Sequence, residues 1–130
     1  MNKVITIDGP SASGKGTLAI FLAERLSWKI LDSGALYRAF AYFSISENNE
    51  RLIEQKLKKI SFNIADNSIQ VLFENEDISR HLRTEETAIQ ASKISSLPST
   101  REILLPIQRF FSETSNLIAD GRDMGSVVFP

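Results

Sequence analysis

One glycine-rich segment near the N-terminus indicates the fold of the chain: Gly9-Pro10-Ser11-Ala12-Ser13-Gly14-Lys15-Gly16-Thr17. It follows a β-branched run that ends at Asp8 and opens a segment with helical periodicity, which is the context that a phosphate-binding loop requires. The glycines let the backbone wrap around phosphate oxygens with its N–H groups pointing inward, and the dipole of the following helix adds to the attraction. Lys15 can reach the β- and γ-phosphates of a nucleotide. The stretch therefore predicts a nucleotide-binding loop rather than a Gly/Ser-rich turn that binds nothing.

The segments around this loop predict an α/β fold. Residues 3–8 and 28–31 read as short strands, and residues 15–27 between them read as a helix. Strand, helix and strand in this order form a βαβ unit, in which the two strands are parallel. A further apolar strand is expected over residues 116–120. We expect the helix to face the core with its apolar side chains at helical spacing, which are Leu18, Phe21, Leu22 and Leu26.

The expected elements between residues 33 and 98 do not continue this alternation of strand and helix. They indicate a subdomain inserted into the core fold. Residues 61–65 and 68–73 read as the strands of a hairpin joined by Asp66-Asn67. Helices are expected over residues 35–44 and 47–60, and a third from Thr84 to Pro98. This third helix carries a small-residue stripe that would allow close packing, formed by Ala88, Ala91, Ser92 and Ser95. We expect a partial core domain over about 1–32 and 99–130, with the insert over about 33–98.

The position of Arg101 indicates a role beyond stability. Ser99 and Glu102 have the spacing of a capping box, which predicts that a helix begins at Ser99. Arg101 then falls in the first turn, where the positive end of the helix dipole disfavours a cation. An acidic residue would suit stability better at this position, so a function explains the arginine.

The composition excludes several classes of protein. The chain has 130 residues, of which 42% are hydrophobic and 24% charged, as in ordinary globular proteins. Lys and Arg number 15 against 16 Asp and Glu, so no global basic field favours nucleic acid. The absence of cysteine excludes disulfides, thiolate metal sites and a thiol nucleophile. Because no signal-peptide pattern and no membrane-length apolar stretch is found, we expect a cytoplasmic protein with no membrane partner.

Several motifs resemble those of known kinases. The Gly-Lys-Gly-Thr ending of the loop resembles nucleoside monophosphate kinases, in which the hydroxyl arrives at the position of Thr17. Four segments resemble the bacterial cytidylate kinase family in order and spacing: Ile7-Asp-Gly-Pro-Ser11, Leu31-Asp-Ser-Gly-Ala-Leu-Tyr-Arg38, Ile78-Ser-Arg-His-Leu-Arg-Thr84 and Ala119-Asp-Gly-Arg-Asp-Met-Gly-Ser-Val-Val-Phe-Pro130. This resemblance implies a P-loop nucleoside monophosphate kinase fold, with a parallel core sheet and an inserted monophosphate-binding subdomain. It implies transfer of the γ-phosphoryl group of ATP to CMP or dCMP with Mg²⁺.

The resemblance also implies roles for individual residues. Residues Gly9 to Thr17 would bind ATP, and Thr17 is the candidate for contact with Mg²⁺. Arg38 and Arg122 would hold the CMP phosphate, which their expected places after two core strands also suit. Lys15, Arg122 and Asp123 are the catalytic candidates. The full set of substrate-binding candidates is Ser33, Arg38, Ser92, Arg101, Asp120, Arg122 and Asp123.

Ser92, Arg101 and Asp123 match the family residues that contact cytosine. A carboxylate suits cytosine because it accepts from the 4-amino group, where uracil presents an acceptor. For three of the candidate residues, the sequence also allows a different role. Ser92 could serve close packing, Ser33 could be the N-cap of the next helix, and Asp120 could support Mg²⁺ as the strand-end acid of other P-loop enzymes does.

Family members are considerably longer than this chain. The resemblance therefore implies that the C-terminal strands and the lid are absent, and that the first strand becomes an exposed edge open to association. We expect full-length members to be monomers and this chain alone to be weakly active or inactive, because the lid excludes water. Two alternatives stay open. One is another P-loop kinase acting on AMP, shikimate or dephospho-coenzyme A, and the other is a non-catalytic nucleotide-binding fragment.

Overall fold

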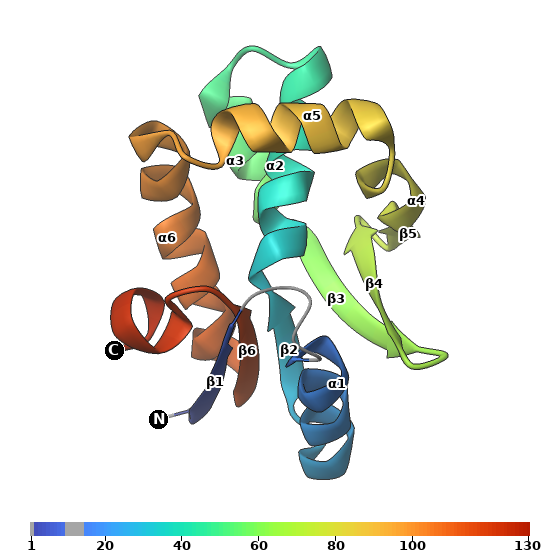
Figure 1. The fold of residues 1–130 in the computed structure, drawn as a ribbon, viewed down its shortest axis with the longest axis vertical. Coiled ribbons are helices and arrows are strands. Elements are labelled where there is room, and N and C mark those ends of the chain that lie inside the picture. Colours follow the sequence, from blue (N-terminus) through green and yellow to red (C-terminus); the bar gives the residue numbers. More distant parts are fainter. Residues whose placement is uncertain (1, 10–14) are drawn as a thin grey trace.

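The computed structural model describes residues 2–9 and 15–130, and two three-stranded sheets lie within them (Figure 1). The first sheet is parallel, with the order β1-β6-β2, and consists of β1 (Val4–Asp8), β6 (Leu117–Gly121) and β2 (Lys29–Asp32). The second is antiparallel, with the order β3-β4-β5, and consists of β3 (Ile60–Ala65), β4 (Ser68–Phe73) and β5 (Glu76–Asp77). The predicted α/β fold with a parallel core is confirmed.

Helices pack against both sheets and against one another. The structure contains α1 (Lys15–Leu26), α2 (Ser33–Ser46), α3 (Glu50–Leu57), α4 (Ser79–Leu82), α5 (Glu85–Ile94), α6 (Pro98–Thr114) and the π-helix η1 (Met124–Val128). Figure 1 shows α2 rising from the end of β2 and α5 crossing above it. The helix predicted over residues 47–60 is shorter, because Asn49 caps its start and Ile60 begins β3. The sequence analysis did not predict β5, α4 or η1, which are too short to show a period.

The hairpin between β3 and β4 is confirmed, including its turn. Asp66 and Asn67 have φ angles of 52° and 57°, and Ala65 pairs with Ser68 across the turn. Two consecutive residues with positive φ match the type I′ turn, whose twist fits the two strands.

The face that α1 buries is not the predicted one. Leu18, Phe21 and Leu26 are 49%, 56% and 41% exposed, whereas Ala19 and Ala23 are 0% and 2% exposed. The two alanines pack with Ile30 of β2 and Ile118 of β6. Small side chains let the helix lie close to the sheet, so the alanine face is the core face. Of the four predicted residues, Leu22 alone is partly buried and packs against this cluster, and the other three point outward. Ala19 and Ala23 are also at helical spacing, which is why periodicity alone did not separate the two faces.

The start of α6 also differs from the prediction. Leu97 is the N-cap residue and makes no side-chain cap bond, Pro98 is the first helical residue, and Ser99 lies inside the helix. The predicted capping box of Ser99 and Glu102 is therefore wrong, as is the expectation that Pro98 ends the preceding helix, since α5 ends at Ile94. Proline suits the first helical position because its missing N–H would have no partner there.

The main hydrophobic cluster joins both predicted parts of the chain. Its fully buried members include Leu36 of α2 and Leu57 of α3 together with Leu104 of α6 and Leu117 of β6. The division into a core domain and an insert stays a prediction. Among the described residues, β1 pairs with β6 alone, so it forms one edge of the parallel sheet, as the sequence analysis expected.

Candidate functional site

The carboxyl ends of the three parallel strands lie side by side and form the candidate site. Asp8 of β1 is the register partner of Gly121 of β6, and Asp32 of β2 is the partner of Asp120. The helices α1 and α2 begin from the same edge (Figure 1). Ligands of open α/β sheets bind at this edge, because the loops that leave the strands gather there.

The predicted nucleotide-binding loop meets this edge at both of its ends. Pro10, Ser11, Ala12, Ser13 and Gly14 lie outside the described residues, and so does the side chain of Lys15. Before them, the Gly9 amide donates to the Gly121 carbonyl oxygen over 3.3 Å. After them, a β-carbon placed on Gly16 would lie 4.0 Å from Oδ2 of Asp120, and Thr17 is exposed. The buried carboxylate of Asp120 therefore lies beside the start of α1.

The start of α2 has a different cap from the one considered in the sequence analysis. Asp32 is the N-cap residue, and its Oδ1 accepts from the Ala35 amide over 3.0 Å. Ser33 is therefore not the N-cap. Its buried hydroxyl instead donates to Oε1 of Gln108 over 2.7 Å, and Gln108 Nε2 donates to the Leu104 carbonyl oxygen. Ser33 thus connects the site to α6, a contact that the sequence analysis missed.

Arg38 lines a small polar pocket beside the start of α2. The pocket has a volume of about 90 Å³, and Asp32, Ser79 and Arg83 also line it. Both arginines are exposed. Two guanidinium groups at one pocket suit an anion such as phosphate. The sequence analysis assigned Arg38 but not Arg83. The family-like segment Ile78–Thr84 contains Arg83, but only the fold of α4 brings it to this pocket.

Ser92 is not needed for packing. It is exposed on α5, as is Ala88, while Thr87 and Ile94 form the buried side of this helix. The small-residue stripe is therefore wrong for these two positions. Because Ser92 faces solvent, close packing does not account for it.

Arg101, which is predicted to contact cytosine, also forms a hydrogen bond with the end of α5. Its Nε donates to the Ser95 carbonyl oxygen over a long 3.5 Å. Ser95 is the C-cap residue of α5, where a cation is favoured by the negative end of the helix dipole. Burial raises the pKa of Tyr37 on α2, and the positive charge of Arg101 acts in the opposite direction. Arg101 therefore lies near both α5 and α2.

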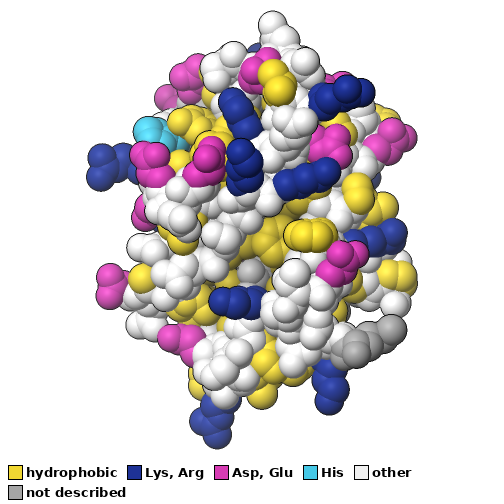
Figure 2. Space-filling model, turned by 180° about the vertical axis from the view of Figure 1, so that it is seen from behind, with side chains coloured by type: hydrophobic (Ala, Val, Ile, Leu, Met, Phe, Trp, Pro, Cys, Tyr) yellow, Lys and Arg dark blue, Asp and Glu magenta, His cyan; other side chains and the backbone are white. Residues whose placement is uncertain are grey.

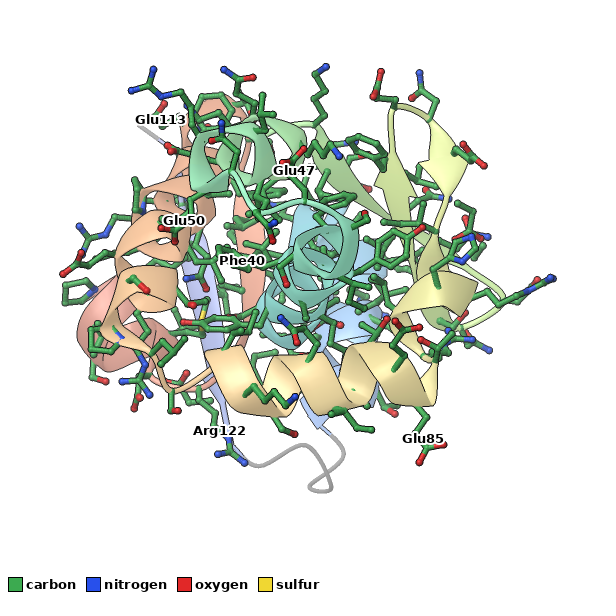
Figure 3. The ribbon with its side chains drawn as sticks, turned by 90° about the horizontal axis from the view of Figure 1, so that it is seen from above. Phe40, Glu47, Glu50, Glu85, Glu113 and Arg122 are labelled. Carbon is green, nitrogen blue, oxygen red and sulfur yellow. The ribbon has the colours of Figure 1, made fainter. Side chains whose placement is uncertain are left out.

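Arg122 and Asp123 form the tip of a tight turn after β6. Both side chains are exposed, and Figure 3 shows Arg122 projecting outward at the edge of the molecule. Asp123 has a φ of 57°, in the left-handed region. Asp8, Ser33, Asp120 and this turn are all held at one sheet edge.

A family model for cytidylate kinase matches residues 5–130. The chain belongs to the cytidylate kinase family. Three curated relatives, each named cytidylate kinase, are about equally similar. The protein of Aeromonas salmonicida is 48% identical over 136 residues, that of Photobacterium profundum 48% over 133, and that of Pseudomonas putida 49% over 135. The matches cover 98 to 100% of this chain but 58 to 59% of each relative, so the chain spans less than two thirds of their length.

A cavity larger than the Arg38 pocket lies away from the candidate site of this cytidylate kinase family member. It has a volume of about 760 Å³ and is lined by Lys29 at the start of β2, by Ser115 just before β6, and by Phe62, Phe110 and Phe111. In the rear view of Figure 2, hydrophobic side chains gather in a hollow and Lys and Arg side chains surround it. Because this cavity is at the amino ends of the strands, it contains none of the predicted site residues.

Over residues 2–9 and 15–130, no three His, Cys, Asp or Glu side chains gather in a way that could hold a metal ion. Over the same residues, no helix has the length and apolar character needed to cross a membrane.

Proposed function

We propose that this chain carries the nucleotide-binding part of an enzyme that transfers the γ-phosphoryl group of ATP to CMP or dCMP. Membership of the cytidylate kinase family supports nucleotide-dependent phosphoryl transfer. The observation that carries the proposal is that Gly9, the start of α1, the start of α2 and the Arg122 turn all lie at one sheet edge.

The donor nucleotide would be bound by residues 9–17. The amide groups of the loop and the Lys15 side chain would hold the ATP phosphates, where negative charge develops during transfer. The Thr17 hydroxyl and the Asp120 carboxylate are the protein oxygens proposed for Mg²⁺. This fits the preference of Mg²⁺ for a few protein oxygens completed by phosphates and water, since Asp120 lies beside Gly16. When bound, Mg²⁺ would neutralise charge on the transferred phosphate.

The acceptor phosphate would be held by arginines. We assign Arg38 and Arg122 to this role, with Arg83 as a further cation at the small polar pocket. Ser33 would contribute differently, because its hydroxyl proton is directed to Gln108. To donate to a phosphate oxygen, that hydroxyl would have to turn away from Gln108.

Ser92, Arg101 and Asp123 are proposed to select cytosine. Ser92 and Asp123 face solvent, which leaves them accessible to a base. A carboxylate accepts from the cytosine 4-amino group but meets an acceptor in uracil, so UMP should bind more weakly. The near-neutral charge of the chain supports a small nucleotide as its partner rather than a nucleic acid.

The proposed reaction is a direct in-line transfer without a covalent intermediate. The nucleophile is an oxygen of the acceptor phosphate, and the bond that breaks joins the γ-phosphorus of ATP to the β,γ-bridging oxygen. Catalysis of this kind consists of positioning and of electrostatic stabilisation by Lys15 and the two arginines.

The proposal is tested by comparing acceptors. ADP formation by the chain is measured with CMP, dCMP, UMP and AMP, and acceptor binding is measured by calorimetry in parallel because turnover is expected to be weak. CMP and dCMP should bind more tightly than UMP and AMP by about tenfold or more. Equal binding of AMP would contradict the assignment.

A matched pair of variants tests the donor side. Lys15→Met should weaken ATP binding or turnover by about tenfold or more while leaving the unfolding midpoint unchanged. Lys59→Met removes an exposed lysine just after the C-cap of α3 and should change neither. If the two variants bind ATP equally well, residues 9–17 do not hold the donor phosphates.

A further inference from the structure

The Asp8 carboxylate holds two backbone amides that lie far away in sequence. Its Oδ1 accepts from the Met124 amide over 2.6 Å, and its Oδ2 accepts from the Gly125 amide over 3.0 Å. Both oxygens are therefore engaged with the start of η1. Hydrogen bonds from an amide to a charged carboxylate are stronger than neutral ones, and the first of these two is short.

These bonds close the turn that carries Arg122 and Asp123. On one side of the turn, Gly121 is the register partner of Asp8 in the sheet. On the other side, Met124 and Gly125 return to the carboxylate of the same Asp8. Between them, Asp123 adopts a left-handed φ of 57°, and its carbonyl oxygen accepts from the Val127 and Val128 amides. One aspartate thus fixes both ends of the turn.

The close fit at Gly125 leaves the turn little freedom. A β-carbon on Gly125 would lie 3.0 Å from Oγ1 of Thr6 and 3.3 Å from Oδ2 of Asp8. Both distances are tighter than ordinary contacts, so an alanine there would displace Thr6 or Asp8 by a few tenths of an ångström. Glycine at position 125 therefore leaves the space that the Asp8 carboxylate occupies.

We infer that Asp8 is a positioning residue for the acceptor nucleotide. It ends the strand that leads into residues 9–17, and its carboxylate holds the turn that presents Arg122 and Asp123. Asp8 thereby fixes the acceptor side of the site relative to the donor side without touching either nucleotide. Phosphoryl transfer requires this kind of precise relative placement of the two substrates. This inference rests on the proposed function, because it assigns Arg122 and Asp123 to the acceptor.

Asp8→Asn is the most informative variant. It keeps the size and shape of the side chain but leaves one acceptor oxygen, and its NH₂ group would face a backbone N–H. The turn should loosen while the fold stays intact. Gly125→Ala disturbs the same contact from the opposite side, and Glu24→Gln on the exposed face of α1 is the matched control.

The experiment measures affinity for CMP and for ATP, together with hydrogen exchange of the Met124 and Gly125 amides. In Asp8→Asn, exchange at both amides should accelerate, and CMP affinity should fall about tenfold while ATP affinity changes less than about threefold. Gly125→Ala should give the same pattern, and the double variant should lose no more affinity than the weaker-binding single variant. Glu24→Gln should match the wild type in every measurement.

Other results would contradict the positioning role of Asp8, its closure of the turn or the proposed function. If exchange accelerates while CMP affinity is unchanged, or if CMP and ATP affinities fall equally, Asp8 is not a positioning residue for the acceptor. If exchange does not accelerate, the carboxylate does not hold the turn. If the wild-type chain binds no CMP although exchange accelerates in Asp8→Asn, the proposed function fails while the closure of the turn by Asp8 stands.

Discussion

Ser33 and Gln108 join the first residue of α2 to the middle of α6 through a hydrogen bond of 2.7 Å between two buried side chains. Gln108 also donates to the Leu104 carbonyl oxygen, so both ends of its amide group are engaged. Ser33 lies against Gly121, at the base of the Arg122 turn. The packing of α6 is therefore linked to the edge of the sheet that carries the candidate site.

Replacement of Gln108 tests this link. Gln108→Ala removes the partner of the Ser33 hydroxyl and leaves a cavity, so the free energy of unfolding should fall by about 2 to 3 kcal/mol. The exposed Gln55 of α3 provides the control, and Gln55→Ala should change stability by less than about 0.5 kcal/mol. Urea unfolding followed by circular dichroism measures both. Equal effects of the two variants would show that the buried bond contributes nothing.

Replacement by alanine of two glycines near the site should have opposite effects on the free energy of unfolding. A β-carbon at Gly121 would lie 2.7 Å from the Ser33 Cβ and 2.9 Å from the Met124 Sδ, so Gly121→Ala should destabilise by about 1 to 3 kcal/mol. At Gly34, in the first turn of α2, the nearest atom is Asp32 Oδ1 at 3.5 Å, an ordinary contact. Gly34→Ala should stabilise by about 0.5 kcal/mol, because alanine restricts the unfolded chain. A stable Gly121→Ala variant would contradict the packing at this turn.

The orientation of α1 gives a third prediction. Phe21 is exposed and Ala23 is buried against the sheet. Phe21→Gln should therefore change the free energy of unfolding by less than about 0.5 kcal/mol, whereas Ala23→Gln should lower it by about 2 kcal/mol or more. Thermal unfolding of the two variants compares these effects. If Phe21→Gln destabilised the protein more than Ala23→Gln, the face of α1 with the large side chains would be the buried one.

Asp77 predicts a dependence of stability on pH. Hydrogen bonds from the Ser79 side chain and then from its backbone amide lower the pKa of Asp77 from its ordinary value of 3.8, and Arg83 and Arg80 add to this. A lowered pKa in the folded state means that the stabilisation is present above pH 3.8 and is lost as the pH falls through the folded value.

The check for Asp77 compares wild type with Asp77→Asn in urea at a series of pH values. The wild type should be more stable than Asp77→Asn near pH 6, and the difference should shrink as the pH falls to about 3 and below. A difference that grows on acidification would have the wrong sign for this assignment.

Local sequence signals predicted the parts of the fold that depend on neighbouring residues. The Asp66-Asn67 turn and the helix that starts after Thr84 each combine a residue type with an adjacent periodic segment. The family resemblance was confirmed by the match over residues 5–130. The buried face of α1 was not predictable in this way, because Ala19 and Ala23 have the same helical spacing as the larger side chains and only packing against β6 distinguishes them.

The contacts that hold the candidate site together join residues that are far apart in the sequence. Sequence periodicity does not predict such contacts. Asp8 and Met124 are 116 positions apart, and Ser33 and Gln108 are 75 apart. From the sequence, Asp8 was expected at most to order the loop after its strand. Its contact with η1 could not be predicted because its partners are backbone amides, which every residue except proline presents. η1 is set by that contact and by the left-handed Asp123, and neither leaves a periodic signal.

An NMR titration of the isotopically labelled chain with CMP and with UMP tests whether the acceptor nucleotide binds at the predicted sheet edge. We expect CMP to perturb the amides of residues 33–38 and 121–125 and to bind at least about tenfold more tightly than UMP. Equal affinities for the two nucleotides, or perturbations confined to the 760 Å³ cavity around Phe62 and Phe110, would contradict this expectation.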